Sequence, residues 1–415
     1  MRIVFALMGS RGDVQPALPV ARELRRRGHE VVSGVAPNLR PLADKLGLEP
    51  VEVGVDSGEL LRSDLVRRRL RSRHPRRRLR AVQEVLTHGW DELRRGLVPI
   101  AQGADVVVTG LLGQQVGSAV AEREDCGFAA LHYCPVRSNT SSGLPVGSPG
   151  AQRALWALGE GLRWSLTRRA ETEQRAALGL AAPTVDLPTR LRDRGAVEVQ
   201  AYDAALFPGL AEEWGPRRPL TGFLALSEEE RALVGEGGVD DELDAWLAAG
   251  DPPVYVGFGS MPVADPEALL TAVEQATGDL GLRALVGMGW NDVVAGPTRD
   301  RVRVVGSVDH AAVFPRCVAV VHHGGAGTTA AGLRAARPTV VAWYSADQPH
   351  WGRLLSRAGV GTRFRAASLD RTTLREALEE VLRPDVVRRA AELSARLVSP
   401  EAAVRAAADA VEMAG

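Results

Sequence analysis

The sequence predicts an α/β protein with two doubly wound parallel sheets, one in each half of the chain. Short apolar runs that are typical of buried strands alternate with longer segments that have a helical pattern. This alternation occurs in the N-terminal half and begins again after a segment rich in proline and glycine. The length of 415 residues is too great for one core and suits two or three domains.

The N-terminal half contains the first series of strands and helices. Strands are expected at Ile3–Met8, Glu30–Ala36, Val51–Val53, Asp105–Thr109, Phe128–Tyr133 and Val197–Tyr202. Helices are expected at Ala17–Arg27, Gln114–Glu124 and Ala151–Leu178, and residues 60–99 have a helical pattern with many arginines. Because parallel sheets bind ligands at the carboxyl ends of their strands, the loop Gly9–Pro16 is a candidate binding loop.

The C-terminal half repeats the pattern. Strands are expected at Val254–Phe258, Arg283–Gly287, Val302–Val305, Val318–Val321 and Thr339–Ala342, and a helix at Thr328–Arg337. The expected organisation is an N-terminal domain at 1–206, a linker at 207–219 and a C-terminal domain at 220–398. The last helix, 399–415, is expected to pack back on the N-terminal domain.

Composition and charge narrow the class of protein. The hydrophobic content of 45%, the charged content of 25% and the zero net charge are ordinary for a soluble protein and argue against a dedicated nucleic-acid binder. Three scattered cysteines do not make a disulfide framework, and no apolar run reaches the about 18 residues of a membrane span. A cytoplasmic protein is expected.

The stretch His322–Thr329 is the strongest local motif. It follows an apolar run, contains three glycines, and leads into a helical segment. Glycines let the backbone approach a phosphate, and the free N–H groups of a helix start carry a partial positive charge. The motif therefore predicts a site for a phosphate-bearing ligand, with His323 as a further donor.

Other interpretations of this motif stay open at this point. Gly325, Gly327 and Ala330 fit the dinucleotide pattern G-x-G-x-x-[GA], although the next strand does not end in the acidic residue that this pattern normally has. The adjacent histidines could suggest a metal, but neighbours on a strand point to opposite faces. His322 is more simply a packed structural histidine.

Two motifs at opposite ends of the chain resemble a known family. His322–Thr329 with Asp347-Gln348, and Gly9–Pro16, are similar to sequences of nucleotide-sugar-dependent glycosyltransferases of the GT-B fold. The similarity is greatest to the enzymes that glycosylate antibiotic aglycones and to sterol glycosyltransferases. The resemblance implies two Rossmann-like domains that face each other across a cleft, with the acceptor bound by the first and the donor sugar by the second.

The resemblance also implies roles for particular residues. Asp13 corresponds to the base that removes the proton of the acceptor hydroxyl, whereas the local sequence alone favours a helix cap at this position. Donor contacts are expected from Ser10, Arg11, Gly12, Ser260, Trp290, Val308, His323, Gly324, Gly325, Ala326, Gly327, Thr328, Asp347 and Gln348. His132 and Tyr133 are candidates for the acceptor pocket, which the loop Pro135–Gly150 is expected to border as a mobile segment.

Some features limit what the resemblance implies. Plant relatives have a base-stacking Trp near Gly306 and a ribose-binding Glu near Ala331, and neither is present here. Without the Glu, a dTDP-sugar is as plausible as a UDP-sugar. No Asp-x-Asp is present, so no metal and no cofactor are expected beside the co-substrate. The segment Arg67–Arg80 is interpreted as a solvated helical face, with peripheral contact to an anionic membrane as the alternative.

The expected function is that of an inverting, metal-independent glycosyltransferase that acts on a glycopeptide or polyketide aglycone. A sterol or lipid acceptor is the first alternative. An NAD-dependent oxidoreductase and a nucleotide-sugar-binding regulator without catalysis are the others. The oligomeric state is left open by the sequence.

Overall fold

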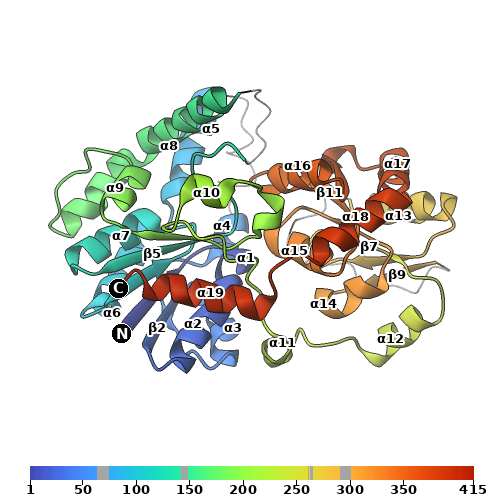
Figure 1. Cartoon of the computed structure of the whole chain (residues 1–415), viewed down its shortest axis with the longest axis horizontal. Helices are drawn as coiled ribbons and strands as arrows, with labels where there is room; N and C mark the ends of the chain where they lie inside the picture. Colours follow the sequence, from blue (N-terminus) through green and yellow to red (C-terminus); the bar gives the residue numbers. More distant parts are fainter. Residues whose placement is uncertain (63–73, 142–147, 260, 262–264, 290–300) are drawn as a thin grey trace. The chain divides into compact units, whose positions relative to one another are not determined.

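A computed structural model of the chain describes residues 1–62, 74–141, 148–259, 261, 265–289 and 301–415. These residues form two compact units (Figure 1). The N-terminal unit comprises Met1–Ala204, Pro208–Ser227 and Val398–Gly415, and the C-terminal unit comprises Ala205–Phe207 and Glu228–Leu397.

The N-terminal unit is built on a six-stranded parallel sheet. Its strands are β1 (Arg2–Leu7), β2 (Glu30–Val35), β3 (Val51–Glu52), β4 (Val106–Thr109), β5 (Gly127–His132) and β6 (Val197–Gln200), in the order β3-β2-β1-β4-β5-β6. The order reverses between β1 and β4, which is where doubly wound sheets bind their ligands. The loops after these two strands are therefore the first place to look for a site.

Helices cover both faces of this sheet. They are α1 (Arg11–Val14), α2 (Leu18–Arg26), α3 (Arg40–Lys45), α4 (Ser57–Arg62), α5 (Pro75–Thr87), α6 (Trp90–Ala101), α7 (Gln114–Arg123), α8 (Pro149–Ala177), α9 (Leu187–Asp193), α10 (Leu210–Trp214) and α19 (Pro400–Glu412). Alternate residues of β1 point to opposite faces, so Val4 and Ala6 pack in one core with Leu93 and Leu97 of α6. The apolar run at the start of the chain thus serves two cores.

The last helix, α19, packs beside α2, where Figure 1 shows it in red near the blue N-terminal elements. Its buried side chains are mostly alanine and valine, which allow a close approach. Arg27 binds the carboxylates of Asp409 at 2.7 Å and Glu412 at 2.8 Å. Apolar packing and ion pairs therefore both tie the end of the chain to the N-terminal unit.

The C-terminal unit contains a second six-stranded parallel sheet with the same connectivity. Its strands are β7 (Val254–Gly257), β8 (Ala284–Gly287), β9 (Val302–Val305), β10 (Ala319–His322), β11 (Thr339–Trp343) and β12 (Gly361–Arg365), in the order β12-β11-β10-β7-β8-β9. The order reverses between β7 and β10. The predicted pair of doubly wound parallel sheets is confirmed.

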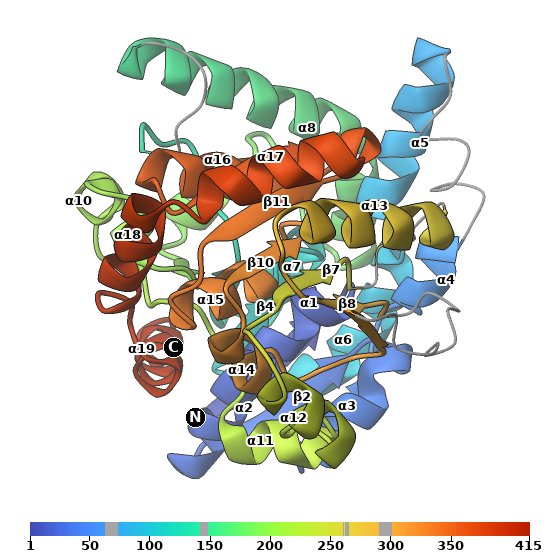
Figure 2. The same cartoon turned by 90° about the vertical axis from the view of Figure 1, so that its right-hand side faces the viewer.

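Helices again lie on both faces of the second sheet. They are α11 (Glu228–Val234), α12 (Asp241–Ala248), α13 (Pro266–Asp279), α14 (His310–Val313), α15 (Ala326–Arg334), α16 (Gln348–Ala358), α17 (Arg371–Val381) and α18 (Pro384–Ser394). Figure 2 shows α13 and α17 side by side on one face and α14 and α15 on the other. Val254 and Val256 belong to the core under α13 and α17, whereas Tyr255 between them packs in the opposite core with Phe314.

The proline-rich segment expected as a linker, 207–219, lies for the most part inside the N-terminal unit. Its end runs beside the edge strand β6: Glu198 N–H donates to the Arg217 carbonyl, and Leu220 forms a parallel bridge with Gln200. The chain enters the C-terminal unit between Ser227 and Glu228. The segment was predicted as a linker because its prolines and glycines are typical of one. Its backbone pairing beside the sheet edge is too short to leave a periodic pattern in the sequence.

Two elements differ from the predictions in the C-terminal half. The strand β12 was not expected, because its sequence Gly-Thr-Arg-Phe-Arg lacks an apolar run and occupies the sheet edge. The helix expected at 328–337 is α15, which starts two residues earlier and ends three residues earlier. Ala336 has a positive φ of 56° and ends the turn that follows the helix.

Candidate functional site

The first candidate site lies in the loop after β1, beside the reversal point of the N-terminal sheet. Asp13 is the third residue of α1, and its Oδ2 accepts hydrogen bonds from Ser10 N–H at 2.8 Å and Ser10 Oγ at 2.7 Å. This is a capping box, in which the first and last members of the turn bind each other. The N-cap of α1 is thus Ser10, and Asp13 takes part in this cap as the third residue of the helix instead of capping a helix near Pro16.

Gly9 shapes this loop because Asp13 lies directly against it. Gly9 has a φ of +113°, which L-residues rarely adopt, and a Cβ at this position would lie 2.5 Å from Asp13 Oδ2. The carboxylate is thus held between a glycine backbone and Ser10, while the residue as a whole is half-buried. A side chain held this way keeps one orientation before any substrate arrives.

The other residues of the loop differ in how they are held. Arg11 Nε donates to Gln15 Oε1 at 2.7 Å, so its guanidinium is anchored along the helix. Gly12 is exposed. The donor contacts expected from Ser10, Arg11 and Gly12 remain predictions. The hydroxyl of Ser10 already donates its hydrogen bond to Asp13.

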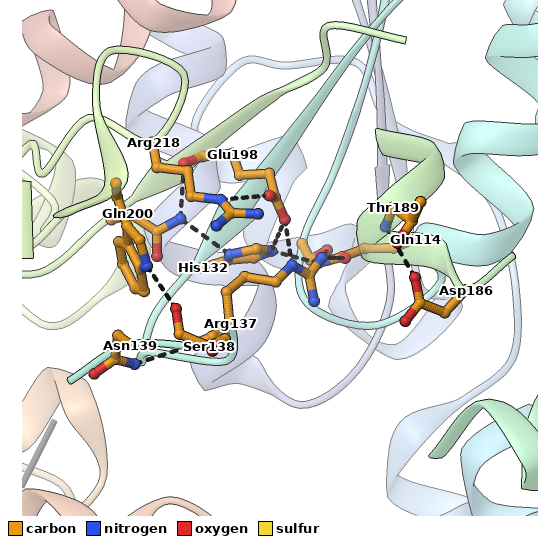
Figure 3. A network of polar contacts seen from close by, with 12 residues as sticks. Gln114, His132, Arg137, Ser138, Asn139, Asp186, Thr189, Glu198, Gln200 and Arg218 are labelled. Atoms are coloured by element: carbon orange, nitrogen blue, oxygen red, sulfur yellow. Dashed lines mark hydrogen bonds and ion pairs between the residues drawn. The ribbon is translucent and has the colours of Figure 1, made fainter. Parts of the chain in front are cut away.

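His132, at the end of β5, lies in a buried network of polar side chains (Figure 3). Its Nε2 is 2.8 Å from Gln114 Nε2 and its Nδ1 is 3.2 Å from Gln200 Nε2. The amide oxygens have other partners, because Gln114 Oε1 accepts from Arg137 Nη2 and Gln200 Oε1 accepts from Tyr202. A neutral imidazole has one acceptor nitrogen, so it can accept a hydrogen bond from only one of the two amides. His132 has no exposed surface among these side chains, and the acceptor contact expected from the sequence stays a prediction.

Glu198 is the charged centre of the same network. It accepts hydrogen bonds from Arg137 Nε and, at 2.8 Å, from Arg218 Nε. Burial alone would raise the pKa of Glu198, but the charges of Arg137 and Arg218 outweigh burial and the pKa is lowered. Burial lowers the pKa of His132 to about 3, so the imidazole is neutral.

The network also fixes the first part of the loop that follows β5. Trp214 Nε1 donates to the Ser138 carbonyl at 2.9 Å, and Thr140 N–H and Oγ1 donate to Glu213 at 2.9 and 2.8 Å. Residues 135–141 are therefore anchored on α10, unlike the mobile loop expected from their composition. Residues 142–147 lie outside the described residues.

Tyr133 follows His132 and has a different environment. Its side chain is buried, and among the described residues its hydroxyl has no hydrogen-bond partner. Burial, followed by the charge of Asp13, raises the pKa of Tyr133. The phenol therefore stays protonated beside the capping-box carboxylate.

The second candidate site lies after β10, beside the reversal point of the C-terminal sheet. Gly324 has a φ of +94°, and a Cβ there would lie 2.7 Å from Val341 Cγ1 and 3.0 Å from Gln348 Cβ. The Gly324 N–H donates to His322 Nδ1 at 2.9 Å, and the His322 side chain is fully buried. His322 therefore shapes the turn from inside.

His323 lies across the turn between two glycines. A Cβ on Gly325 would lie 2.6 Å from His323 Nε2, and a Cβ on Gly259, after β7, would lie 3.3 Å from His323 Cε1. Burial lowers the pKa of His323 to about 4, so the imidazole is neutral near pH 7 and can donate from only one nitrogen. Its Nδ1 is buried without a hydrogen-bond partner among the described residues.

The helix α15 begins at Ala326, and its N-cap is Gly325, which has no side chain to bind the first N–H groups. Gly327 is exposed and Thr328 is half-buried. Because these N–H groups are left for an external acceptor, the helix start is suited to an anion. The residues predicted from 323 to 328 thus come together in one turn.

Asp347 and Gln348 lie after β11, on the other side of this turn. Asp347 Oδ2 accepts from Trp351 Nε1 at 2.9 Å rather than capping its own helix. Gln348 Oε1 accepts from the N–H groups of Tyr344 and Ser345. The amide group of Gln348 thus supports the loop after β11, and burial raises the pKa of Asp347.

The remaining donor predictions are less well described. Val308 is half-buried and packs against the core that contains Phe314. Ser260 and Trp290 lie outside the described residues. Gly259 and Gly289, which the sequence interpretation did not single out, come so close that a Cβ on Gly289 would lie 2.2 Å from the Gly259 carbonyl oxygen. The available signal was a glycine close behind a predicted strand: Gly259 directly follows Val254–Phe258, and Gly289 is the second residue after Arg283–Gly287.

The comparisons with known proteins agree with this geometry. The N-terminal domain model of glycosyltransferase family 28 matches residues 3–96, and the C-terminal domain model of erythromycin biosynthesis protein CIII-like proteins matches residues 286–412. An uncharacterized glycosyltransferase of Mycobacterium tuberculosis is 42% identical over 99% of this chain and 98% of its own length. This chain belongs to the GT-B glycosyltransferases.

Two further relatives of this glycosyltransferase have individual names, and one of the names states an acceptor class. Glycosyltransferase GtfE of Amycolatopsis orientalis is 31% identical over 98% of the chain and 96% of its own length. The sterol 3-beta-glucosyltransferase of Arabidopsis thaliana is 28% identical over 87% of the chain and 57% of its own length. Family membership removes the dinucleotide oxidoreductase alternative.

Solved structures share the fold of the glycosyltransferase. The glycotransferase of kitacinnamycin has a TM-score of 0.72 at 19% identity and covers 99% of this chain and 98% of its own. Glycosyltransferase VinC, solved in complex with dTDP, has a TM-score of 0.67 at 18% identity and covers both chains fully. Among the described residues, no helix is long and apolar enough to cross a membrane, and no cluster of three metal-binding side chains occurs.

Proposed function

We propose that this glycosyltransferase moves a sugar from a nucleoside diphosphate to a hydroxyl group of its acceptor with inversion at the anomeric carbon. Asp13 takes the proton of the acceptor hydroxyl as that oxygen bonds to the anomeric carbon. In the same step the bond from this carbon to the diphosphate oxygen breaks, and the diphosphate leaves with the electron pair. The observation that carries this proposal is the carboxylate of Asp13, held in one orientation by Ser10 at the reversal point of its sheet.

The donor diphosphate is proposed to bind at the turn after β10. The neutral His323 imidazole and the N–H groups at the start of α15 would stabilise the leaving negative charge, a role that needs no metal ion. Asp347 would bind hydroxyls of the donor sugar through the oxygen that Trp351 leaves free. In this assignment, the N-terminal unit binds the acceptor and the C-terminal unit binds the donor.

The nucleotide is proposed to be dTDP or UDP. The chain has no glutamate near Ala331 that would select a ribose hydroxyl, and the similar structure of VinC contains dTDP. The acceptor is proposed to be a natural-product aglycone of the glycopeptide or polyketide type, as the resemblance to antibiotic enzymes suggests. A sterol or other lipid is the alternative, which the Arabidopsis sterol enzyme supports.

A binding and transfer experiment tests this function. Melting temperatures are measured with UDP-sugars, dTDP-sugars and NAD, and the stabilising donor is then incubated with an acceptor panel for mass spectrometry. We expect a nucleotide sugar, and not NAD, to raise the melting temperature, and one acceptor to gain the mass of one sugar. A donor that binds and is never transferred, across glycopeptide, polyketide and sterol acceptors, would instead support a regulator without catalysis.

The arginine-rich segment is proposed to be a solvated face, and contact with an anionic membrane is the alternative. In its described part, the start of α5, residues 74–80 are all exposed, and Leu79 lies among Arg76, Arg77, Arg78 and Arg80. The exposed leucines Leu155, Leu158 and Leu162 occur on α8. Co-sedimentation with anionic vesicles that weakens in high salt would establish the membrane contact, and no co-sedimentation at low salt would establish the solvated face.

A further inference from the structure

Several arginines gather where α16 packs on β12, the edge strand of the C-terminal sheet. Arg353 and Arg357 are one turn apart on α16, so they lie on the same side of the helix. Arg363 and Arg365 are two residues apart on β12 and project from the same face of the strand. A Cβ on Gly352 would lie 2.9 Å from Arg363 Cβ and 3.0 Å from Arg363 Cδ, so the stem of Arg363 rests directly on α16.

These arginines, 353, 357, 363 and 365, are called the arginine cluster, and they lack acidic partners. Among the described residues, none of their guanidinium groups makes an ion pair or accepts or donates a hydrogen bond. The chain has as many acidic as basic side chains, 51 of each, so acids are not scarce. The arginines of α17 and α18 in the same unit all pair with carboxylates: Arg371 with Asp279, Arg375 with Glu379, Arg388 with Glu392, and Arg389 with Asp385.

Grouping like charges in this way lowers the stability of the unit. Arg353 and Arg357 repel each other at the spacing i, i+4. Burial, followed by the charges of Arg363 and Arg357, lowers the pKa of Arg353. Gly352 adds to the cost, because glycine in the interior of a helix is unfavourable. An anion bound from outside would neutralise the cluster and offset these costs.

Packing, rather than ion pairing, holds part of the cluster in place. The stem of Arg363 lies against Gly352, and the Arg365 guanidinium lies 4.9 Å from the ring centroid of Trp343, its partner across the strands. Arg357 and Arg365 are exposed, whereas Arg353 and Arg363 are half-buried. The cluster is therefore oriented before any ligand arrives and is open to solvent.

We propose that the arginine cluster is a binding site for a phosphate group, separate from the turn after β10. Guanidinium groups stay charged at every physiological pH and bind phosphate oxygens through paired N–H donors. Several of them, supplied by a helix and a strand, match a group with several charged oxygens. A soluble phosphorylated ligand and a lipid headgroup share this chemistry. The inference does not depend on the proposed role of Asp13.

The test compares the wild type with two double variants that each remove two positive charges from the C-terminal unit. Arg353→Gln with Arg363→Gln changes the half-buried members of the cluster. The control, Arg375→Gln with Arg388→Gln, changes two arginines that pair with glutamates. Binding of inorganic phosphate is measured by calorimetric titration, with sodium chloride keeping the ionic strength constant.

We expect one binding event of the wild type and the control to be at least about tenfold weaker in the cluster variant, because contacts with charged groups are lost. Phosphate bound at the turn after β10 is common to all three proteins and cancels in the comparison. In chloride, the cluster variant should melt no lower than the control, because it loses no ion pair. Lost binding is then distinguished from lost folding.

Vesicles with and without phosphatidic acid identify the source of the phosphate. Binding to phosphatidic acid that the cluster variant loses would indicate a lipid headgroup, and binding of free phosphate alone would indicate a soluble ligand. Equal phosphate binding in all three proteins, or none in any, would overturn the inference. The arginines would then serve to keep the edge strand β12 from pairing with other chains. A cluster variant that melts well below the control in chloride would also contradict it.

Discussion

At the scale of single residues, the glycine at position 9 is what allows Asp13 to occupy its orientation. An alanine there would place a methyl group 2.5 Å from Asp13 Oδ2, in addition to the strain of a positive φ. We expect Gly9→Ala to lower the transfer rate at least tenfold, because the carboxylate must leave its place beside Ser10. Steady-state kinetics with a fixed donor concentration measure this effect.

Gly28→Ala is the matched control for this substitution. Gly28 has a similar φ of +91°, yet an added Cβ would meet no atom within 4 Å. Both variants should lose about 1 kcal/mol of stability through the positive φ, and Gly9→Ala should lose more because of its contact with Asp13. Only Gly9→Ala should lose activity. Equal activity in the two variants would show that the contact between Gly9 and Asp13 has no role in transfer.

The sequence predicted the residues of the loop after β1 and of the turn after β10, but not the side chains of the buried network around Glu198. The chemistry of Asp13 and His323 follows from residue type, motif and resemblance. The pairing of Glu198 with Arg137 was not predicted. The two residues are 61 positions apart in the sequence, and each resembles an ordinary surface charge until the fold brings them into contact. The burial of His132 was missed for the same reason: the sequence shows the end of a strand but not the side chains that cover it.

At the scale of elements, the network around Glu198 holds the carboxyl ends of β5 and β6 to α7 and to the loop after β5. Glu198→Gln would remove the charge that compensates the buried guanidinium of Arg137 (Figure 3). We expect a loss of about 3 kcal/mol in the free energy of unfolding, because a buried charge is left without its partner. Urea denaturation measures this loss.

The exposed pair Arg169–Glu173 on α8 provides the comparison within the same unit. Its side chains are 87% and 62% exposed, so solvent already screens the interaction. Glu173→Gln should leave the unfolding midpoint almost unchanged. If Glu198→Gln were equally mild, the network would be an incidental cluster rather than a support for β5 and β6.

Element boundaries were predicted well where one residue pattern dominates. The strands β1, β7 and β10 and the helix α7 lie within one or two residues of the expected positions, because apolar runs and helical periodicity define them. The edge strand β12 and the pairing of residues 217–221 beside β6 depend instead on the neighbouring backbone. Such elements have no pattern of their own from which they could be predicted.

At the scale of the whole molecule, buried neutral histidines make the free energy of unfolding decrease as the pH is lowered. Burial lowers the pKa of His310, His323 and His350 to about 4, and that of His322 is lowered as well; all four belong to the C-terminal unit. The unfolded chain takes up protons below about pH 6.5, whereas the folded unit does not until about pH 4. Stability is therefore complete above pH 6.5 and falls as the pH is lowered toward 4.

This linkage predicts an asymmetry between the two units. Between pH 7 and 5, each such histidine costs about 2 kcal/mol, and the N-terminal unit has only His132 with a pKa lowered in this way among its described residues. Differential scanning calorimetry with hydrogen exchange should show the C-terminal unit losing protection first. Earlier loss in the N-terminal unit would contradict this account of the buried histidines.

The central claim is that Asp13 acts as the base in sugar transfer, and Asp13→Asn tests it most directly. The amide preserves the size of the side chain and can still accept from Ser10, but it cannot take a proton at neutral pH. We predict that transfer falls at least about 100-fold while calorimetry shows unchanged affinity for the donor. Near-normal turnover with intact donor binding would contradict the claim.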